Sequence, residues 1–432
     1  MMPRAKLKAQ KVDAAEALLS GRGLPAGGAW ITRAREAAKA RVAELGLPVR
    51  RDEYWRYTDP RRLTDASAQS ATLHDTKGET PVFDAFDRLK LVFVDGVFDA
   101  EASDPLALDG VEICTLAQAA TTDLHWARDL YGTLEARGQK PVERSLASLN
   151  TAYATEGLLI RITAKVSKPI SIIYLRQSTD ADVMVHHLVQ VESGAEATIL
   201  ENGPMAARFN QVMEVDIAEG ATLHHIRAQG RDHQRSGAAH LFARLGAGAQ
   251  LKSFTLTANG ALIRNDAVIW LDGAGGSAHV AGATVGDGAF HHDDTVFITH
   301  GAPRCESRQV YKKVLRGGAV GVFQGKILVE RAAQLTDGYQ ISQSLLLDEN
   351  AQFLAKPELE IYADDVKCSH GSTSGEIDPN QLFYLRARGV PEDRAKMLLV
   401  LAFLAEALDE IADPDLAEDL RARLEAWLAR RA

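Results

Sequence analysis

The sequence contains few cysteines and few aromatic residues. Only three cysteines occur in 432 residues, and aromatic side chains make up 6% of the chain. Three thiols are too few for a disulfide framework or a four-cysteine zinc site, so both are excluded. Sparse cysteine is typical of proteins in a reducing compartment, and we expect a cytoplasmic location.

Long apolar runs and an excess of basic charge are also absent. No stretch approaches the ~18 consecutive apolar residues of a membrane-spanning helix, and we expect no membrane contact. The basic N-terminal residues include no apolar segment like that of a secretory signal. With 49 Lys and Arg against 58 Asp and Glu, the formal net charge is −9. We therefore expect no nucleic-acid partner, because such proteins bind by neutralising phosphates.

The chain does contain enough apolar sequence for a large folded body. Hydrophobic residues make up 46% and charged residues 25%, as in ordinary globular proteins. The residue pattern predicts three domains. These are an N-terminal helical and mixed α/β domain over residues 1–157, a β-rich core over 158–376 and a C-terminal helical domain over 377–432.

Helical periodicity dominates the start of the chain. Apolar residues three and four apart predict helices over 14–19 and 32–45. The segment 90–98 predicts a pair of strands around a central Asp-Gly turn of type I′. Two further helices are expected over 123–136 and 142–154.

The core consists of short β-rich runs separated by glycine-bearing turns. Six of the runs are typical strands: 159–163, 171–175, 186–191, 197–201, 267–271 and 295–299. Related turn phrases recur, each with an alanine: Ala195, Ala221, Ala249, Ala278, Ala319 and Ala351. Their spacings of 26, 28, 29, 41 and 32 residues favour a β-solenoid, in which each coil stacks on the last. A β-sandwich stays open as an alternative, although its turns usually recur every ~8–12 residues.

The last part of the chain is helical again. Asp378 is a predicted N-cap for a short helix that Gly389 ends. Pro391 is expected at the first position of a longer helix that runs to about Ala412, and Pro414 opens the last helix.

The longer of these helices is unusual in composition. Residues 397–405 are apolar almost all round, and residues 406–419 contain seven acidic side chains and no basic one. A helix that is apolar on more than one face must be covered by its own domain or by another chain. An ordinary helical cap and a partner-docking element are both open.

Two glycine-rich segments are weak nucleotide-binding candidates. Residues 273–278 match G-x-G-x-x-A, but the sequence that follows is strand-like, whereas a dinucleotide site needs a helix there. Residues 321–327 contain Gly-Lys without the spacing of a phosphate-binding loop. We expect neither dinucleotide binding nor ATPase activity, and no flavin motif is visible.

Adjacent histidines recur in the core as His186-His187, His224-His225 and His291-His292. Neighbours on a strand point to opposite faces, so a pair cannot easily hold one ion. We expect one member of each pair to pack inward and the other to face solvent. The exception is His292 with Asp294, which share a face and carry atoms that can bind a metal.

The strongest local constellation is residues 366–375. Cys368 and His370 are two positions apart, so an extended chain projects both from one face. They could bind iron or zinc, or the imidazole could lower the pKa of the thiol for sulfur chemistry. The alternative is a packed cysteine beside a hydrogen-bonded histidine. Cys114 lies in an apolar run and is expected in the core, whereas Cys305 lies in a polar turn and is expected to be exposed.

Five segments resemble the SufB/SufD family of iron–sulfur assembly proteins: 53–59, 149–162, 323–329, 333–340 and 356–373. The matches span about residues 53–404, and the last segment, with its Cys-Ser-His-Gly element, is highly specific. The modest length and the absence of a C-x-x-C cluster are closer to the SufD branch than to the longer, cysteine-richer SufB.

The resemblance implies a right-handed parallel β-helix core between helical domains. It implies a non-catalytic scaffold subunit, in a complex with SufB and two copies of the ATPase SufC, where a [4Fe–4S] cluster is built. No cofactor is expected to bind tightly to this chain alone; iron or a cluster would be held transiently in the complex. The family's association with reduced flavin belongs to the complex.

The resemblance also assigns residues. The family histidine at the SufB interface, implicated in cluster assembly, corresponds to His370, and the nearby cysteine to Cys368; both are candidate metal ligands. The family docks SufC through its C-terminal helices, where the candidate contacts are Phe383, Leu385, Leu398, Leu399 and Phe403. Because β-helix edges expose unpaired backbone groups, we expect edge pairing with SufB and allow a homodimer of the isolated chain.

One alternative from another class remains. Some β-helix proteins are enzymes that act on polysaccharides, and they need clustered carboxylates along a groove. The sequence shows no such cluster.

Overall fold

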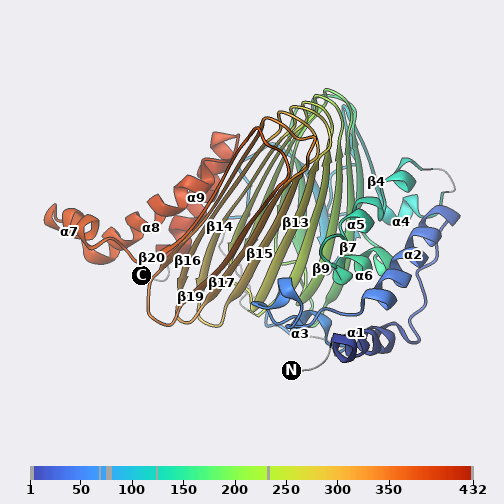
Figure 1. Ribbon diagram of the computed structural model, residues 1–432, viewed down its shortest axis with the longest axis horizontal. Coiled ribbons are helices and arrows are strands. Elements are labelled where there is room, and N and C mark those ends of the chain that lie inside the picture. The colour runs from blue at the N-terminus through green and yellow to red at the C-terminus, as the bar shows by residue number, and fades with distance from the viewer. Residues whose placement is uncertain (1–3, 68–69, 74–79, 123–124, 231–233, 430–432) are drawn as a thin grey trace.

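The computed structural model describes residues 4–67, 70–73, 80–122, 125–230 and 234–429. Within these residues the chain alternates between two ten-stranded sheets, so that each coil adds one strand to each sheet. Pairing between successive coils is parallel, as in the ladder of β10 with β12. The prediction of a mainly β protein with a β-solenoid core and helices at both ends is confirmed (Figure 1).

The strands of sheet A, in spatial order, are β2 (Val97–Asp99), β1 (Leu89–Val94), β6 (Ile170–Leu175), β8 (Glu196–Asn202), β10 (Thr222–Gly230), β12 (Gln250–Ala258), β14 (Ser277–Asp287), β16 (Glu306–Arg316), β18 (Thr336–Leu346) and β20 (Val366–Gly375). Those of sheet B are β19 (Gln352–Ile361), β17 (Val320–Val329), β15 (His291–His300), β13 (Leu262–Leu271), β11 (Ser236–Leu245), β9 (Arg208–Ile217), β7 (Asp182–Val191), β5 (Leu158–Ile162), β4 (Val111–Thr115) and β3 (Ala107–Leu108). The six predicted strands lie within these elements, except that the run 159–163 extends one residue beyond the end of β5. The division into three domains stays a prediction.

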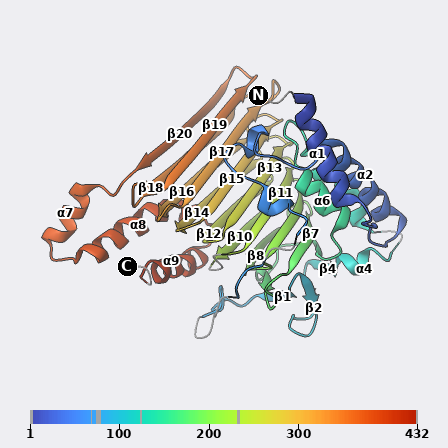
Figure 2. The same cartoon turned by 90° about the horizontal axis from the view of Figure 1, so that it is seen from below.

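The helices are α1 (Arg4–Leu19), α2 (Ala29–Leu45), η1 (Glu53–Trp55), α3 (Arg61–Thr64), α4 (Leu116–Ala119), η2 (Trp126–Asp129), α5 (Thr133–Arg137), α6 (Ser145–Tyr153), α7 (Pro379–Ala387), α8 (Glu392–Leu408) and α9 (Pro414–Ala429). The N-terminal helices pack on the outside of sheet B and the C-terminal helices on the outside of sheet A, on opposite sides of the solenoid (Figure 2). The covered strands are therefore buried on both faces, which explains their nearly continuous apolar sequence. No helix in the described part of the chain is long and apolar enough to cross a membrane.

The recurring alanines do not form one column along the solenoid. The carbonyls of Ala195 and Ala221 accept from the first residues of β10 and β12, at 2.8 Å each, and the carbonyl of Ala249 accepts from the first residue of β14 at 2.9 Å. Ala319 and Ala351 instead precede β17 and β19 of the other sheet. The spacing of 41 residues marks this change of sheet, so the expectation of a single repeating turn is corrected.

The two ends of the solenoid differ. At the first end, β1 and β2 form an antiparallel hairpin whose turn residues Asp95 and Gly96 have φ of 47° and 81°, as predicted for type I′. The outermost strands there, β2 and β3, have only three and two residues. At the other end, β19 and β20 have ten residues each and pair on one side only. We call this second end the open end.

The N-terminal helices follow the sequence pattern with one exception. The predictions for 14–19, 32–45 and 142–154 are confirmed by α1, α2 and α6. The single helix expected over 123–136 is wrong for the described part, because η2 and α5 are separate there, and residues 123–124 lie outside the described residues. Gly132 breaks the helical path, since its φ of 71° is left-handed.

The C-terminal helices begin where predicted. The Asp378 carboxylate accepts from the Asn380 amide at 2.8 Å, which confirms the N-cap of α7. Helix α8 ends at Leu408 rather than near Ala412, and the Asp413 carboxylate accepts from the Asp415 amide at 2.9 Å in the first turn of α9. Helix α7 has no buried residue and projects away from the solenoid in both views (Figures 1 and 2).

Candidate functional site

Cys368 and His370 lie on the last strand of the open end. Strand β20 pairs with β18 in register, so that Cys368 is beside Gly338 and His370 is beside Gln340. The alternation of an extended strand puts both side chains on the inward face of sheet A, as predicted. Cys368 is half-buried and His370 is exposed, so both are at a boundary that another chain can reach.

The Cys368 thiol packs against its own solenoid. Its neighbours include Ile327 and Leu359 of sheet B, and a Cβ built at Gly338 would lie 3.2 Å from its sulfur. Burial raises the pKa of the Cys368 thiol, and the Asp337 carboxylate adds to this, although a Gly338 N–H acts in the opposite direction. This environment therefore acts against the lowered thiol pKa that one of the two sequence interpretations requires.

A metal ion at this edge would need ligands from elsewhere. Among the described residues, no group of three or more His, Cys, Asp or Glu side chains is arranged to hold a metal. Cys368 and His370 supply one soft and one borderline donor, whereas iron and zinc sites usually have three or four protein ligands. The described residues alone do not complete such a site.

His292 and Asp294 share a face, as predicted, but a lysine takes the place of a metal. The Lys313 ammonium lies 2.8 Å from His292 Nδ1 and 2.5 Å from Asp294 Oδ2, inside the solenoid. Asn265 contacts both partners from β13 at 3.1 and 3.2 Å. Burial, followed by the Lys313 charge, holds the pKa of His292 well below its usual range. This cluster is a buried ion pair, and the metal-site prediction for it is wrong.

The histidine pairs point to opposite faces, as predicted. His186 Nε2 lies 2.9 Å from Glu214 on the outer face of sheet B, whereas His187 Nε2 lies 2.8 Å from the Tyr174 hydroxyl in the interior. Both imidazoles are fully buried, because the N-terminal domain covers this face. The expectation that one member faces solvent is wrong for this pair. His224 is half-buried on the outer face of sheet A, opposite His225.

The other two cysteines are structural. Cys114 was expected in the core; it packs against an apolar cluster but is only half-buried, with its sulfur 3.5 Å from His125 Nε2. Cys305 is only 1% exposed, and its thiol donates to the Gly273 carbonyl at 3.2 Å. Its predicted exposure is wrong, because it lies directly before β16, inside the ladder, where its carbonyl accepts from the Asp337 amide of β18 at 3.0 Å. Burial raises the pKa of both thiols.

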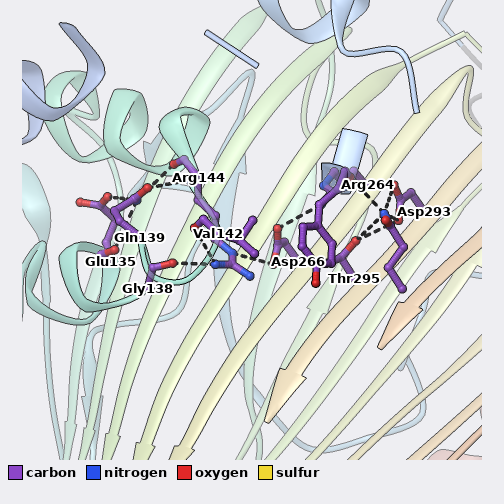
Figure 3. Close-up of polar contacts among 11 residues, drawn as sticks. Glu135, Gly138, Gln139, Val142, Arg144, Arg264, Asp266, Asp293 and Thr295 are labelled. Atoms are coloured by element: carbon purple, nitrogen blue, oxygen red, sulfur yellow. Dashed lines mark hydrogen bonds and ion pairs between the residues drawn. The ribbon is translucent and has the colours of Figure 1, made fainter. Parts of the chain in front are cut away.

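A chain of buried polar contacts joins the N-terminal domain to sheet B (Figure 3). Arg144 donates to Asp266 at 3.0 Å, and Arg264 pairs with Asp266 at 3.3 Å and with Asp293 at 2.5 Å. Each of these side chains is nearly inaccessible to solvent. The two arginines and two aspartates balance one another in charge, and their contacts join the N-terminal part of the chain to sheet B.

Segment 53–59 also joins the N-terminal part of the chain to sheet B, near the open end. The Tyr54 carbonyl accepts from Arg264 at 2.9 Å, and the Arg264 guanidinium lies 4.3 Å from the ring of Trp55. Glu53 pairs with Lys356 of β19 at 2.7 Å. Periodicity gave no signal for this role, which was visible in the sequence only as a family-like segment.

The predicted contacts for SufC differ in exposure. Phe383 is 72% exposed on α7 and Leu398 is 36% exposed on α8, while Leu385 and Leu399 are half-buried. Phe403 is half-buried against the solenoid, where the Lys312 ammonium lies 4.7 Å from its ring.

The acidic residues after Phe403 are partly used within the chain. Glu406 pairs with Lys312, and Glu410 pairs with Arg308, each at 2.5 Å. Helix α8 is therefore a cap on sheet A, and its outer side remains accessible.

Comparison with protein-family models matches nearly the whole chain. Residues 27–172 match the SufBD protein N-terminal region, and residues 174–403 match the SufBD core domain of the SUF system for FeS cluster assembly. The 356–373 segment that carries Cys368 and His370 lies within the core match.

Curated relatives extend over similar lengths. The chain is 28% identical over 396 residues to the iron–sulfur cluster assembly protein SufD of Escherichia coli, covering 89% of this chain and 90% of that protein. It is 30% identical over 409 residues to a SufBD family protein of Synechocystis, covering 90% and 89%. It is also 25% identical over 426 residues to a chloroplastic protein of Arabidopsis thaliana, ABCI7, covering 92% and 86%. Nothing in these findings supports the polysaccharide alternative.

Proposed function

The chain belongs to the SufB/SufD family of iron–sulfur cluster assembly proteins, and we propose that it is the SufD-type scaffold subunit of a SufBCD complex. Its role in iron–sulfur cluster assembly follows from the family. In the finer proposal the chain is non-catalytic and cytoplasmic, supports iron acquisition, and helps to form a [4Fe–4S] cluster at its interface with SufB.

The observation that carries this proposal is the open end. Strands β19 and β20 each present ten residues of backbone with a partner on one side only, whereas the first end is closed by short antiparallel strands. A long unpaired strand is a template for another chain, and natural proteins usually cover it. SufB, a related β-helix, would continue the two sheets by edge pairing. The same edges allow a homodimer when SufB is absent.

Cys368 and His370 would then lie at the joint between the subunits. They provide two donors, and the remaining ligands for iron or a cluster would come from SufB. Iron and the cluster are the cargo of this site, held transiently in the complex and not tightly by this chain alone. The raised pKa of the Cys368 thiol supports weak binding by this chain alone, because the thiol must lose its proton to become a metal ligand.

SufC would dock on the C-terminal helices. Phe383 and Leu398 are exposed there, with Leu385 and Leu399 half-buried beside them. Large exposed apolar side chains on a projecting helix are typical of binding sites. Phe403 contributes less in this proposal, because it already packs under Lys312. Dimerisation of SufC on ATP would move the two β-helix cores relative to one another and expose the joint.

A substitution at His370 tests the proposal. We expect His370→Ala to leave the complex with SufB and SufC intact by size-exclusion chromatography but to lower its iron and acid-labile sulfide content several-fold. Ser369→Ala is the matched control, because Ser369 is the next residue on β20 and points to the opposite face. Normal iron and sulfide in the His370→Ala complex would remove His370 from the mechanism.

A further inference from the structure

A column of left-handed residues runs along one corner of the solenoid, where the chain turns from sheet B into sheet A. Each residue of the column has a φ between 59° and 72°, and its amide donates to a carbonyl of the next coil at 2.6–3.0 Å. In chain order the six members are Gly194, Gly220, Gly248, Gly275, Arg304 and Leu335. The conformation is therefore a fixed requirement of this turn, repeated from coil to coil.

Glycine occupies the first four positions of this column for a conformational reason. Glycine adopts the left-handed backbone without steric cost, whereas the Cβ of any other residue approaches its own carbonyl oxygen. A Cβ built at any of these four glycines has no atom within 4 Å, so lack of space does not explain glycine there. The two coils nearest the open end differ, because Arg304 and Leu335 hold the same conformation with a side chain.

Leu335 is the more unusual of the two. A bulky apolar residue at a φ of 62° is a backbone outlier, and such strain is concentrated at functional positions. Its side chain is 53% exposed, and the apolar cluster at this corner, which includes Val329 and Ala363, does not contain it. Both the backbone strain and the exposed apolar surface are unfavourable in the free chain. The packing of this chain therefore does not explain leucine at this position.

Leu335 is also accessible from the open end. The turn before β18 has six residues, whereas the corresponding turn before β20 has only four. The two turns lie side by side, because the Leu335 amide donates to the Asp365 carbonyl at 2.6 Å, but the shorter turn does not cover the leucine side chain. Ile361 and Tyr362 of the last coil are themselves 39% and 56% exposed. We call Leu335, Ile361 and Tyr362 the corner patch.

We propose that the corner patch is an apolar anchor for SufB at the open end, with Leu335 as its central side chain. A chain that continues both sheets places one of its own turns against the last turn of this solenoid, whichever way its strands run. Exposed apolar patches mark protein–protein sites, and a few such side chains carry most of the binding energy. Pairing of strand edges supplies affinity through the main chain, whereas pockets for side chains supply specificity. The inference rests on the proposed function, because it takes SufB as the partner.

Removal of the Leu335 side chain from the full-length chain tests the inference. We expect Leu335→Gly to weaken SufB binding about tenfold in a calorimetric titration. The same substitution should not lower the urea midpoint of the free chain, because glycine adopts this conformation without strain. Leu335→Asn should weaken binding to a similar extent. Asparagine tolerates the left-handed region, so this variant separates loss of the side chain from a more flexible turn.

Arg304→Gly is the matched control. It makes the same backbone change one coil farther from the open end and should leave SufB binding unchanged. Unchanged SufB affinity in folded Leu335→Gly and Leu335→Asn chains, or an equal loss in Arg304→Gly, overturns the inference. Loss of a homodimer by sedimentation, with SufB affinity unchanged, also overturns it, because the patch would then bind a second copy.

Failure of this inference is distinguishable from failure of the proposed function. If the unaltered chain does not bind SufB, both are wrong. If it binds SufB and the Leu335 variants bind equally well, the edge pairing stands and only the corner patch is removed from the interface.

Discussion

The thiol of Cys368 is a half-buried group whose pKa is raised, chiefly by burial. A thiolate is the nucleophile and the metal ligand, so the isolated chain keeps this sulfur in its unreactive form. The environment changes only when the open end is covered or a cation arrives. The proposed function accordingly places the action of Cys368 after assembly of the complex.

The reactivity of this thiol is testable. In a chain with Cys114→Ser and Cys305→Ser, we expect iodoacetamide to modify Cys368 more slowly than free cysteine at neutral pH. The raised pKa predicts that the rate keeps increasing with pH beyond pH 9.0, the ordinary value for the group. A rate that reaches its plateau near neutral pH would show an activated thiolate and contradict this description.

Sequence spacing was informative about which residues share a face. The two-residue separation of Cys368 and His370 predicted their common face because a strand has a period of two. The same rule paired His292 with Asp294 but gave no indication of Lys313, which comes from the next coil. A contact between coils depends on the register in which two strands pair, and the sequence of one strand does not determine that register.

Helix α8 has one side that packs on the solenoid and one side that is accessible. Leu404 is fully buried against sheet A, whereas Leu398 of the same helix is 36% exposed. The sequence showed that the helix was apolar almost all round, but not which side each neighbour would cover. The interpretation as an ordinary helical cap is confirmed for the buried side, and partner docking on the accessible side stays a prediction.

Two leucine substitutions separate the two sides. We expect Leu404→Ala to lower the free energy of unfolding by about 2–5 kcal/mol, because it leaves a cavity. Leu398→Ala should change it by less than about 0.5 kcal/mol but weaken SufC binding roughly tenfold. Urea unfolding and calorimetric titration with SufC measure the two effects. Unaltered SufC affinity in Leu398→Ala would exclude this side of α8 from the interface.

The strands were predictable where β-branched and apolar residues were continuous, since those runs are buried on both faces. The alanines did not predict which sheet each turn leads into. Ala278 lies in β14 of sheet A, whereas Ala319 precedes β17 of sheet B. The helix expected over 123–136 is interrupted by the left-handed turn at Gly132, which helical periodicity does not detect.

The whole molecule buries many histidines, and this makes its stability dependent on pH. Burial lowers the pKa of His187, His240 and His300 to about 4 each, from an ordinary 6.5. Because the folded pKa lies below the unfolded one, the unfolded chain binds protons first as the pH falls. The stability is fully present above pH 6.5 and is lost between pH 6.5 and about pH 4.

Urea unfolding over this pH interval checks the prediction. Each of the three histidines should contribute about 1.4 kcal/mol per pH unit to the slope. His240→Gln should lower the slope by about 1.4 kcal/mol per pH unit, the contribution of one proton, because glutamine does not titrate at this buried position. A slope that is the same with and without His240 would disprove its depressed pKa.

The asymmetry of the solenoid is the property of the whole molecule that matters most for function. One end is closed within the chain, and the other ends in two ten-residue strands beside Cys368 and His370. The stack of coils was predictable from the recurring turns. The open end was not predictable in this way. It depends on which strands come last in the two sheets, and no residue pattern marks those strands.

Hydrogen exchange of the amides in β19 and β20, with and without SufB, tests the central claim most directly. Amides that pair with a second sheet become protected in proportion to the stability of that pairing. We predict strong protection of residues 352–375 in the complex, with little change at β2 and β3. Unchanged exchange of residues 352–375, with new protection at the closed end, would contradict the account.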